Sequence, residues 1–492
     1  MSNTSSLYPI PDSWKWTTIG EMFSVKGGKR LPKGYSYTSE NTRLYYIRVT
    51  DFNNLTIDTT DLHCISAETQ RKISRYTISK DDVYISIAGS IGKVGVIPGF
   101  LDGANLTENA AKITDIHNYN NKLLAFFLTS QFAQSQITKL VTSSNQPKLA
   151  LFRIKKILIP LIPLPEQERI VAKIEELFTQ LDAGLAELQQ AKAQLKRYRQ
   201  AVLKAAVEGE LTREWREEHQ EELEPASELL ERILRERREK WEQEELAKLR
   251  EKGKEPKDDK WKAKYKEPAL PNTDGLPELP EGWVWANTGS LCDCIVPNRD
   301  KPKSFSGETP WITLPDFNKN GIYIGTSKSN LGLTPDEVIR YKAKIIPEGS
   351  VVMSCVGRFG ITGVVERDLV VNQQLHAFLI PEEVLDSKFL AYAIKTQVPF
   401  MEQVATATTI TYMNKSKCNS VPVPLPPINE QKRIVEKIER RLSVANGIEQ
   451  EFDQALARAE GLRQSILKRA FEGKLVEQRP EDSDARRLVR ND

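Results

Sequence analysis

Glu166–Glu175 reads EQERIVAKIE, and Glu430–Glu439 repeats it as EQKRIVEKIE. A second pair of matching stretches, Val202–Leu211 and Ile466–Leu475, keeps the same offset of 264 residues. Between the two stretches of each copy, mostly apolar residues recur at alternating steps of four and three. This is the spacing of the residues that pair two helices in a coiled coil. The sequence therefore predicts two long helices of equal length, the first from about residue 165 to residue 208.

We expect these helices to pair antiparallel about a pseudo-twofold axis, provided that the folded segment between them brings the second helix back along the first. Under this symmetry Leu188 and its counterpart Phe452 lie at the centre, and Ile174 lies near Ile466 and Val202 near Ile438. The residues expected to pair the helices are Ile174, Leu181, Leu188, Leu195 and Val202 in the first and Ile438, Ile448, Phe452, Leu462 and Ile466 in the second.

The repeat extends to the segments before the helices. Residues 11–20 recur at 280–289 with the same Pro, Trp and Gly positions, and the three glycines of 83–95 recur in 351–363. Short apolar runs broken by Gly, Asn, Asp and Pro indicate β-strands, and apolar periodicity within each copy predicts a helix. The expected helices are residues 120–141 and 387–404. Each copy is thus a mixed α/β module and the chain is α+β, while differing residues between the repeated positions suggest recognition of two different targets.

The predicted organisation has six segments. The insert between the copies is dense in Glu, Lys and Arg, and its residues 226–250 have a helical pattern. Both a solvated helix with a tether and a partner-docking arm are compatible with it. The segments are a first module at 1–163, a first helix at 164–211, a charged helical insert and linker at 212–275, a second module at 276–427, a second helix at 428–475 and a charged tail at 476–492.

Composition excludes several classes of protein. Lys and Arg number 70 against 67 Asp and Glu, so the net charge alone indicates no polyanionic ligand. The five cysteines lack the paired spacing of a zinc site and are expected to be reduced thiols. No stretch approaches the ~18 apolar residues of a membrane span. We therefore expect a cytoplasmic protein with no membrane partner.

No motif for catalysis is present in the sequence. The chain lacks the Asn/Asp-Pro-Pro-aromatic loop of amino-methyltransferases and the Gly-Lys-Ser/Thr loop of nucleotide hydrolases. Its glycine-spaced segments have the wrong spacing for a dinucleotide site, and we expect them to be tight turns. The four histidines have no spacing for a metal or a catalytic triad. The chain is predicted to be non-catalytic, with no cofactor or metal of its own.

Basic and polar loops occupy matching places in the two copies, which favours a recognition function. Lys and Arg suit phosphates, whereas Asn, Gln, Arg, Ser and Thr suit base edges in the major groove. The candidate DNA-binding residues are Lys26, Lys29, Arg30, Lys33, Ser143, Ser144, Asn145, Gln146 and Lys148 in the first copy and Arg299, Lys301, Lys303, Thr408, Thr409, Tyr412, Asn414 and Lys415 in the second.

The Trp-containing openings, the Pro-rich exits at 163–167 and 426–431, and the helix ends at 206–212 and 470–475 resemble the specificity subunit of Type I restriction–modification systems, which serve in host defence. The resemblance implies two target recognition domains, each reading one half of a bipartite asymmetric DNA site, separated by an antiparallel pair of helices. It also implies partners. These are two modification subunits that bind S-adenosylmethionine and methylate adenine at N6, and restriction subunits that use ATP and Mg²⁺.

A different class of protein also fits the repeat. In a structural adaptor the helices would join two protein-binding modules, and DNA would play no part. A gel shift with the modification subunit would separate this alternative from a specificity subunit.

Overall fold

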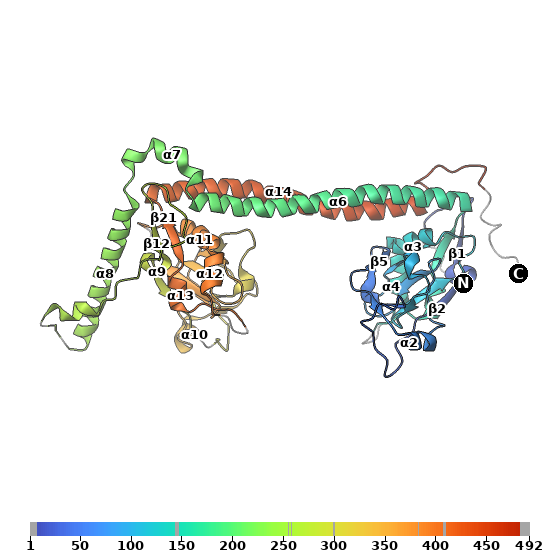
Figure 1. Ribbon diagram of the computed structural model, residues 1–492, viewed down its shortest axis with the longest axis horizontal. Helices are drawn as coiled ribbons and strands as arrows, with labels where there is room; N and C mark the ends of the chain where they lie inside the picture. Colours follow the sequence, from blue (N-terminus) through green and yellow to red (C-terminus); the bar gives the residue numbers. More distant parts are fainter. Residues whose placement is uncertain are drawn as a thin grey trace. The chain divides into compact units, whose positions relative to one another are not determined.

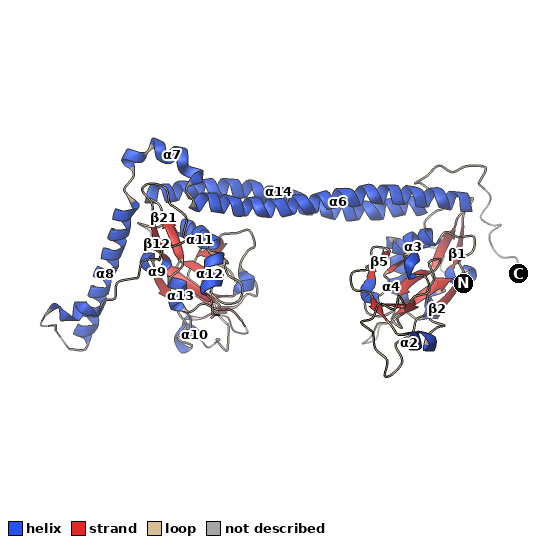
Figure 2. Cartoon of the chain, in the orientation of Figure 1, coloured by secondary structure: helices blue, strands red, loops and turns tan. Residues whose placement is uncertain are grey.

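The computed structural model describes residues 7–142, 147–253, 255–256, 258–298, 301–381, 383–406 and 410–482. Its contacts divide the chain into two compact units. The first comprises Met1–Gln189 together with Asp453–Asp492, and the second comprises Gln190–Phe452. Each unit therefore joins one module to parts of both long helices, and the strands lie within the modules (Figures 1 and 2).

The first module is a mixed structure built on an antiparallel sheet of order β2-β10-β7-β8 and a smaller sheet of order β6-β3-β9. Strand β1 pairs with β11, so the chain leaves the module beside the point at which it began. The elements are β1 (Lys15–Thr18), α1 (Ile19–Met22), β2 (Ser24–Gly27), β3 (Tyr45–Ile47), η2 (Val49–Asp51), β4 (Phe52–Asn53), β5 (Thr56–Ile57), β6 (His63–Cys64), α2 (Ala67–Lys72), β7 (Val83–Ser86), β8 (Val94–Val96), η3 (Gly99–Leu101), β9 (Asn105–Leu106), β10 (Ala110–Thr114), α3 (Asn121–Thr129), α4 (Gln131–Leu140), α5 (Leu151–Ile154) and β11 (Leu158–Leu161).

The second module repeats this order, with a main sheet β13-β20-β17-β18-β15, a smaller sheet β16-β14-β19 and the pair β12–β21. The predicted α+β class is confirmed. The elements are β12 (Val284–Asn287), α9 (Thr288–Leu291), β13 (Asp293–Ile295), β14 (Thr309–Ile312), η7 (Leu314–Asp316), β15 (Tyr323–Ile324), β16 (Gly332–Leu333), α10 (Pro335–Arg340), β17 (Val351–Ser354), β18 (Thr362–Val365), β19 (Val370–Val371), β20 (Leu375–Leu379), α11 (Ser387–Thr396), α12 (Val398–Val404), α13 (Lys415–Asn419) and β21 (Pro422–Leu425).

The single helix predicted in each module is two helices. Ser130 has an extended backbone, ends α3 and caps α4 by accepting a hydrogen bond from the backbone N–H of Ala133 at 3.3 Å. Pro399, in the first turn of α12, marks the corresponding break after α11. A serine cap and a first-turn proline are both ordinary helix starts. Apolar periodicity cannot register such a break, because the buried face continues on both sides of it.

The long helices α6 (Leu164–Val207) and α14 (Ile428–Phe471) are each 44 residues long, which confirms the predicted equal lengths. In the first unit Asp182 of α6 pairs with Arg463 of α14, and Ile174 shares a core with Ile466. In the second unit the Arg199 guanidinium donates to Asn446 Oδ1 at 2.7 Å.

The direction of pairing follows from these contacts. In the first unit Ile174 of α6 shares a core with Ile466 of α14 and Asp182 pairs with Arg463, so the α14 number falls as the α6 number rises. The chain direction of the two helices is therefore opposite, as predicted. Arg199 and Asn446 are the counterparts of Arg463 and Asp182 at the offset of 264 residues, so the two pairs obey the pseudo-twofold relation.

Two residues assigned to the seam of the second helix lie outside it. Ile448 is 40% exposed and Leu462 is 50% exposed. The neighbouring residues Glu449 and Arg463 take the inward positions, where Glu449 pairs with Arg199 at 2.8 Å. A periodicity count of apolar residues misses these positions because charged side chains fill them. Of the other predicted residues, Ile174, Val202, Ile438 and Ile466 are buried, and Leu181, Leu188, Leu195 and Phe452 are half-buried.

The insert forms η4 (Glu210–Thr212), α7 (Arg213–Glu218), η5 (Gln220–Glu222), α8 (Ala226–Glu251) and η6 (Asp259–Lys264). The first part of α8 belongs to the second unit, because Leu229, Leu230 and Ile233 are buried in its core. One turn further along α8, Arg237 donates a hydrogen bond to the Ser290 carbonyl at 2.8 Å and so holds α8 against the second module. Among the residues described, no helix is long and apolar enough to cross a membrane.

Candidate functional site

Each module is fastened to its long helix by a buried carboxylate. Trp14 Nε1 donates to Glu166 Oε2 at 2.8 Å, and Trp283 Nε1 donates to Glu430 Oε2 at the same distance. Burial raises the pKa of Glu166, and the hydrogen bond from Trp14 partly offsets this. The repeated Trp and Glu positions therefore hold the start of the module against the start of its helix.

The adjacent glutamine makes an equivalent pair of bonds in each unit. Gln167 Oε1 accepts from the backbone N–H of Asn120 at 2.7 Å, and Gln431 Oε1 accepts from that of Asp386 at 2.9 Å. Asn120 and Asp386 are themselves the caps of α3 and α11. The Glu-Gln repeat thus positions the same helix of both modules.

The loops that carry most predicted recognition residues meet at one end of each main sheet. In the first module Gly27 of β2 pairs with Ala111 and Ser86 of β7 pairs with Ala110, so the loops after β2 and β7 lie beside the loop before β10. Gly28 passes so close to this loop that an added Cβ would lie 2.1 Å from the Thr107 carbonyl oxygen. Only glycine fits this approach.

The first basic loop contains Lys29, Arg30 and Lys33 and follows Lys26 of β2, and all four residues are exposed. Lys26 Nζ lies 3.8 Å from an Asp115 carboxylate oxygen, at the border of the sheet. Arg30 Nε donates to Glu108 Oε1 at 2.6 Å. An exposed ion pair of this kind contributes little stability, so Arg30 can exchange its partner for a phosphate at small cost.

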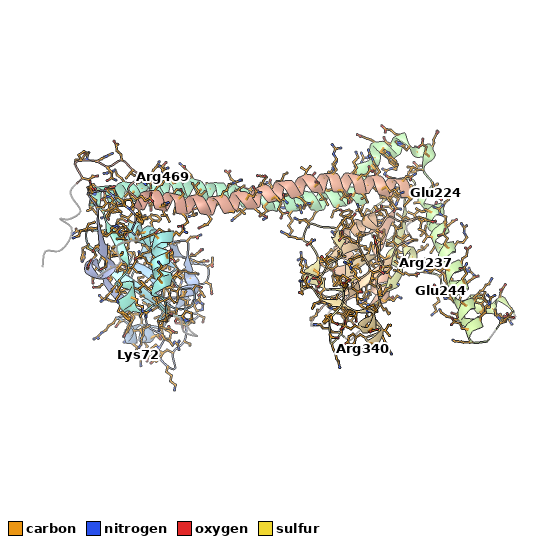
Figure 3. All side chains as sticks on the ribbon, turned by 180° about the vertical axis from the view of Figure 1, so that it is seen from behind. Lys72, Glu224, Arg237, Glu244, Arg340 and Arg469 are labelled. Carbon is orange, nitrogen blue, oxygen red and sulfur yellow. The ribbon has the colours of Figure 1, made fainter. Side chains whose placement is uncertain are left out.

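A second basic segment that the sequence analysis overlooked lies next to this loop. Lys29 Nζ is 5.7 Å from the centre of the Tyr76 ring, and Lys72 Nζ is 4.8 Å from the centre of the Tyr35 ring. The loop after β2 and the C-terminal end of α2 therefore form one surface, at the end of the module that lies away from the long helices (Figure 3). We call it the first basic surface, and its residues are Lys29, Arg30, Lys33, Arg71, Lys72 and Arg75.

The second module has a corresponding surface. Ser304 and Ser306 donate to Glu337 Oε1 at 2.5 and 2.9 Å, and these and backbone hydrogen bonds lower the pKa of Glu337 to about 2. Because Glu337 belongs to α10, its carboxylate ties the loop after β13 to that helix. The second basic surface so formed comprises Lys301, Lys303, Arg340, Lys342 and Lys344, all exposed; Arg340 appears in Figure 3.

Polar loops lie at the same end of each sheet. Lys148 bridges to Ala88 in the turn between β7 and β8, and Tyr412 bridges to Val356 in the turn between β17 and β18. Both turns have glycines of positive φ, such as Gly89 at 72°, which confirms that the glycine-spaced segments are tight turns. Tyr412 and Lys415 are exposed, as is Asn414.

One of these residues has a structural role as well. Asn414 caps α13, and its side-chain oxygen accepts from the backbone N–H of Lys417 at 3.0 Å. The remaining predicted residues, Ser143, Ser144, Asn145, Gln146, Arg299, Thr408 and Thr409, lie outside the described residues.

The first unit also contains a groove of about 1110 Å³ between the module and the helices. Asn53 of β4 and Asn54 in the turn after it line the groove, as do Glu175 and Asp182 of α6. In the second unit the corresponding loop is held against the helix, because Asn320 donates to Glu449 at 2.7 Å. The carboxylates of the lining are matched by Lys93, Lys122 and Arg463, so this groove lacks the excess of cations that the basic surfaces have.

No cluster of His, Cys, Asp and Glu suited to a metal ion occurs among the residues described. The basic surfaces offer cations and hydrogen-bond donors, which suit binding of a polyanion.

The comparisons with known proteins point the same way. A family model described as the Type I restriction modification DNA specificity domain matches residues 11–195 and 280–458. The EcoBI specificity subunit of Escherichia coli is 24% identical over 501 residues, which cover 98% of this chain and 90% of that protein. The StySPI specificity subunit of Salmonella potsdam is 25% identical over 511 residues, covering 96% of this chain and 92% of that protein.

Two solved structures share the fold. A structure from work on complex assembly and conformational transition of the type I R-M system has a TM-score of 0.66 and 19% identity, covering 95% of this chain and all of that one. The HsdS subunit from Thermoanaerobacter tengcongensis has a TM-score of 0.50 and 20% identity, covering 96% of this chain and all of that one.

Proposed function

Because the chain belongs to the family of Type I restriction–modification DNA specificity subunits, we propose that each of its two units reads one half of a bipartite, asymmetric DNA site. As a specificity subunit it recognises DNA and leaves the chemistry to other chains. The family resemblance predicted from the repeats is thereby confirmed.

The matching basic surfaces carry this proposal. Each consists of the loop after the first strand of the main sheet and the C-terminal end of the helix that follows, although the two loops share little sequence. Phosphate contacts fix the position of a protein on DNA without reading its sequence. Equivalent cations on two modules would therefore place each module on the DNA backbone in the same way.

The polar loops beside them are the proposed source of sequence specificity. Tyr412 and Asn414 of the second unit stand where the first unit has Lys148 and Ala150. Such differences in hydrogen-bond donors and acceptors distinguish base edges. Two modules with one arrangement of strands and different loops would read two different half-sites.

The proposal includes the partners. Two modification subunits would bind S-adenosylmethionine and methylate adenine at N6 on a scaffold provided by this chain, and restriction subunits would bring ATP and Mg²⁺. A non-DNA-binding adaptor is the competing function, and family membership argues against it.

The decisive experiment exchanges one module. Residues 9–160 are replaced by the corresponding module of another specificity subunit, and methylated adenines are sequenced in DNA modified by the assembled complex. One half of the recognised site should change, while the other half and the gap stay the same. A change in both halves would show that the modules do not read separately, and an assembled complex that binds no DNA would favour the adaptor.

A second experiment tests the basic surfaces. Lys72→Ala should weaken binding of all DNA sequences alike and lower the salt-dependence slope by about 1. Lys252→Ala, an exposed lysine of the insert, is the matched control and should change neither quantity. A variant at Lys72 that alters the recognised sequence instead would contradict a phosphate-contacting role.

A further inference from the structure

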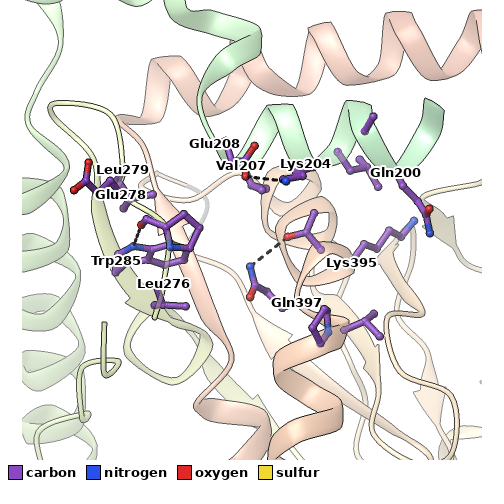
Figure 4. Close-up of a pocket in the computed structure, with 16 residues that line it drawn as sticks. Gln200, Lys204, Val207, Glu208, Leu276, Glu278, Leu279, Trp285, Lys395 and Gln397 are labelled. Carbon is purple, nitrogen blue, oxygen red and sulfur yellow. Dashed lines mark hydrogen bonds and ion pairs between the residues drawn. The ribbon is translucent and has the colours of Figure 1, made fainter. Parts of the chain in front are cut away.

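The second unit contains a pocket of about 680 Å³ that the recognition of DNA does not explain. It lies between the C-terminal part of α6, the segment before β12, and the junction of α11 and α12 (Figure 4). Leu203, Leu276, Trp285 and Val398 give it apolar walls, and Lys395 lies at its edge.

The corresponding place in the first unit is filled by the chain itself. The Tyr8 ring packs against Trp16 with centroids 5.2 Å apart and against Phe132 at 4.8 Å. Phe471, at the end of α14, completes the cluster by packing on Phe127 at 5.0 Å. Tyr8, Trp16 and Phe132 are partly buried and pack against the core of the first unit.

Smaller residues replace these rings in the second unit. At the offsets set by the repeats, Pro277 stands for Tyr8, Val398 for Phe132 and Val207 for Phe471, whereas the tryptophan is kept as Trp285. An open pocket of this size leaves the apolar side chains of its lining without the packing partners that core side chains have. The pocket therefore lies at the positions where the first unit has its aromatic cluster and the second unit has smaller side chains.

The pocket also presents a cation. Burial lowers the pKa of Lys395 to about 8, and its Nζ lies 5.6 Å from the centre of the Tyr392 ring. Lys395 makes no ion pair among the residues that the structure describes. The other charged residues of the lining are Lys204 and Glu208, which pair at 3.7 Å, and Glu278. A buried ammonium group is stabilised by an anion that enters beside it.

We propose that this pocket receives an aromatic side chain, with a carboxylate next to it, from the protein subunit that docks on the second unit. The aromatic ring takes the place that Tyr8 occupies in the first unit, and the carboxylate pairs with Lys395. The partner is a modification subunit, and in this respect the inference rests on the proposed function. Docking on the two units is then unequal, because the first unit fills the site with its own tyrosine.

The site is tested directly with a small probe. 4-Hydroxyphenylacetate carries a phenol ring and a carboxylate, whereas p-cresol carries the ring alone. Titration of the full chain followed by ligand-observed NMR should show tighter binding of 4-hydroxyphenylacetate. Val398→Phe should reduce binding of both compounds at least tenfold, and Lys395→Gln should abolish only the preference for the carboxylate. Arg367→Gln, which removes an exposed cation of the same module outside the pocket and the basic surface, is the matched control. Equal binding by all four proteins would overturn the proposal.

Assembly gives the second readout. Val398→Phe and Lys395→Gln should each weaken association with the modification subunit at least tenfold in sedimentation velocity, while Arg367→Gln should not. Residual complex should methylate the same DNA sequence, because the pocket lies away from the basic surface of its module. Unchanged association in both variants would refute the pocket as a docking site and leave the proposed DNA recognition intact. Loss of sequence recognition with normal association would also refute it.

Discussion

Replacing Trp14 with Phe should destabilise the first unit more than replacing Trp283 with Phe destabilises the second. Both variants remove an indole N–H that donates to a buried carboxylate. In Trp283→Phe, Glu430 Oε1 still accepts hydrogen bonds from the Thr212 hydroxyl and the Arg216 guanidinium, each at 2.7 Å. Glu166 retains only the amide of Gln478 as a hydrogen-bond donor among the contacts described.

The size of the effect follows from this difference. A hydrogen bond to a charged group contributes about 1.5 to 3 kcal/mol, and leaving a buried group under-satisfied costs more than the bond itself. The smaller ring adds a cavity term of about 1 kcal/mol. We therefore expect a loss of about 2 to 4 kcal/mol for Trp14→Phe and, because the carboxylate stays ion-paired, about 1 to 2 kcal/mol for Trp283→Phe.

The effect of Trp14→Phe should also depend on pH. Burial raises the pKa of Glu166, and the indole bond opposes that rise, so the variant moves the folded-state pKa further above its unfolded value. A raised carboxyl pKa means that the stability of the folded state falls as pH rises through the folded pKa. The loss should therefore be greater at pH 7.5 than at pH 5.

Hydrogen exchange followed by mass spectrometry measures the opening free energy of each unit separately. Peptides covering β1 and β11 report on the first unit, and peptides covering β12 and β21 report on the second. Equal losses in the two units, or a loss for Trp14→Phe that is the same at both pH values, would refute this account of the buried carboxylates.

Three further outcomes are expected. Ile466→Ala should lower the free energy of unfolding of the first unit by about 2 to 5 kcal/mol in urea. Leu462→Ala, one turn away and half exposed, should lower it by less than about 1 kcal/mol. Similar losses would show that Leu462 belongs to the helix-pairing seam after all. Affinity for 4-hydroxyphenylacetate should fall about tenfold from pH 7 to pH 9 as Lys395 loses its proton, and Lys395→Gln should remove this dependence while p-cresol binding stays constant. Gly28→Ala should disrupt the first unit, because the new Cβ would meet two carbonyl oxygens; normal exchange protection of β2 and β10 would contradict this.

The repeats made the architecture predictable because they record the same contacts twice. Trp14 and Trp283, or Glu166 and Glu430, can be matched by position alone, and the equal helices follow from their equal offsets. Ser130 shows the limit of such reasoning, since one extended residue splits a helix without altering its apolar face. Glu449 and Arg463 show another limit, because charged residues can occupy a seam when they pair.

The surfaces that we propose to bind DNA were predicted only in part. The basic loops could be located because they follow a repeated strand. Arg71, Lys72 and Arg75 were missed because about forty residues separate them from the loop, and only tertiary contacts bring them together. The cap formed by Asn414 is likewise invisible in a count of polar residues, since the same side chain suits a base edge and a helix start.

The division of the chain into units also sets the order in which they can be completed during synthesis. The second unit uses only Gln190–Phe452, whereas the first needs Asp453 onward as well as Met1–Gln189. Gln478, which donates to Glu166, leaves the ribosome long after that glutamate. At about 5 to 20 residues per second, the first module waits roughly 15 to 60 s for its missing helix. The half of the protein that is made first is therefore the half that is finished last.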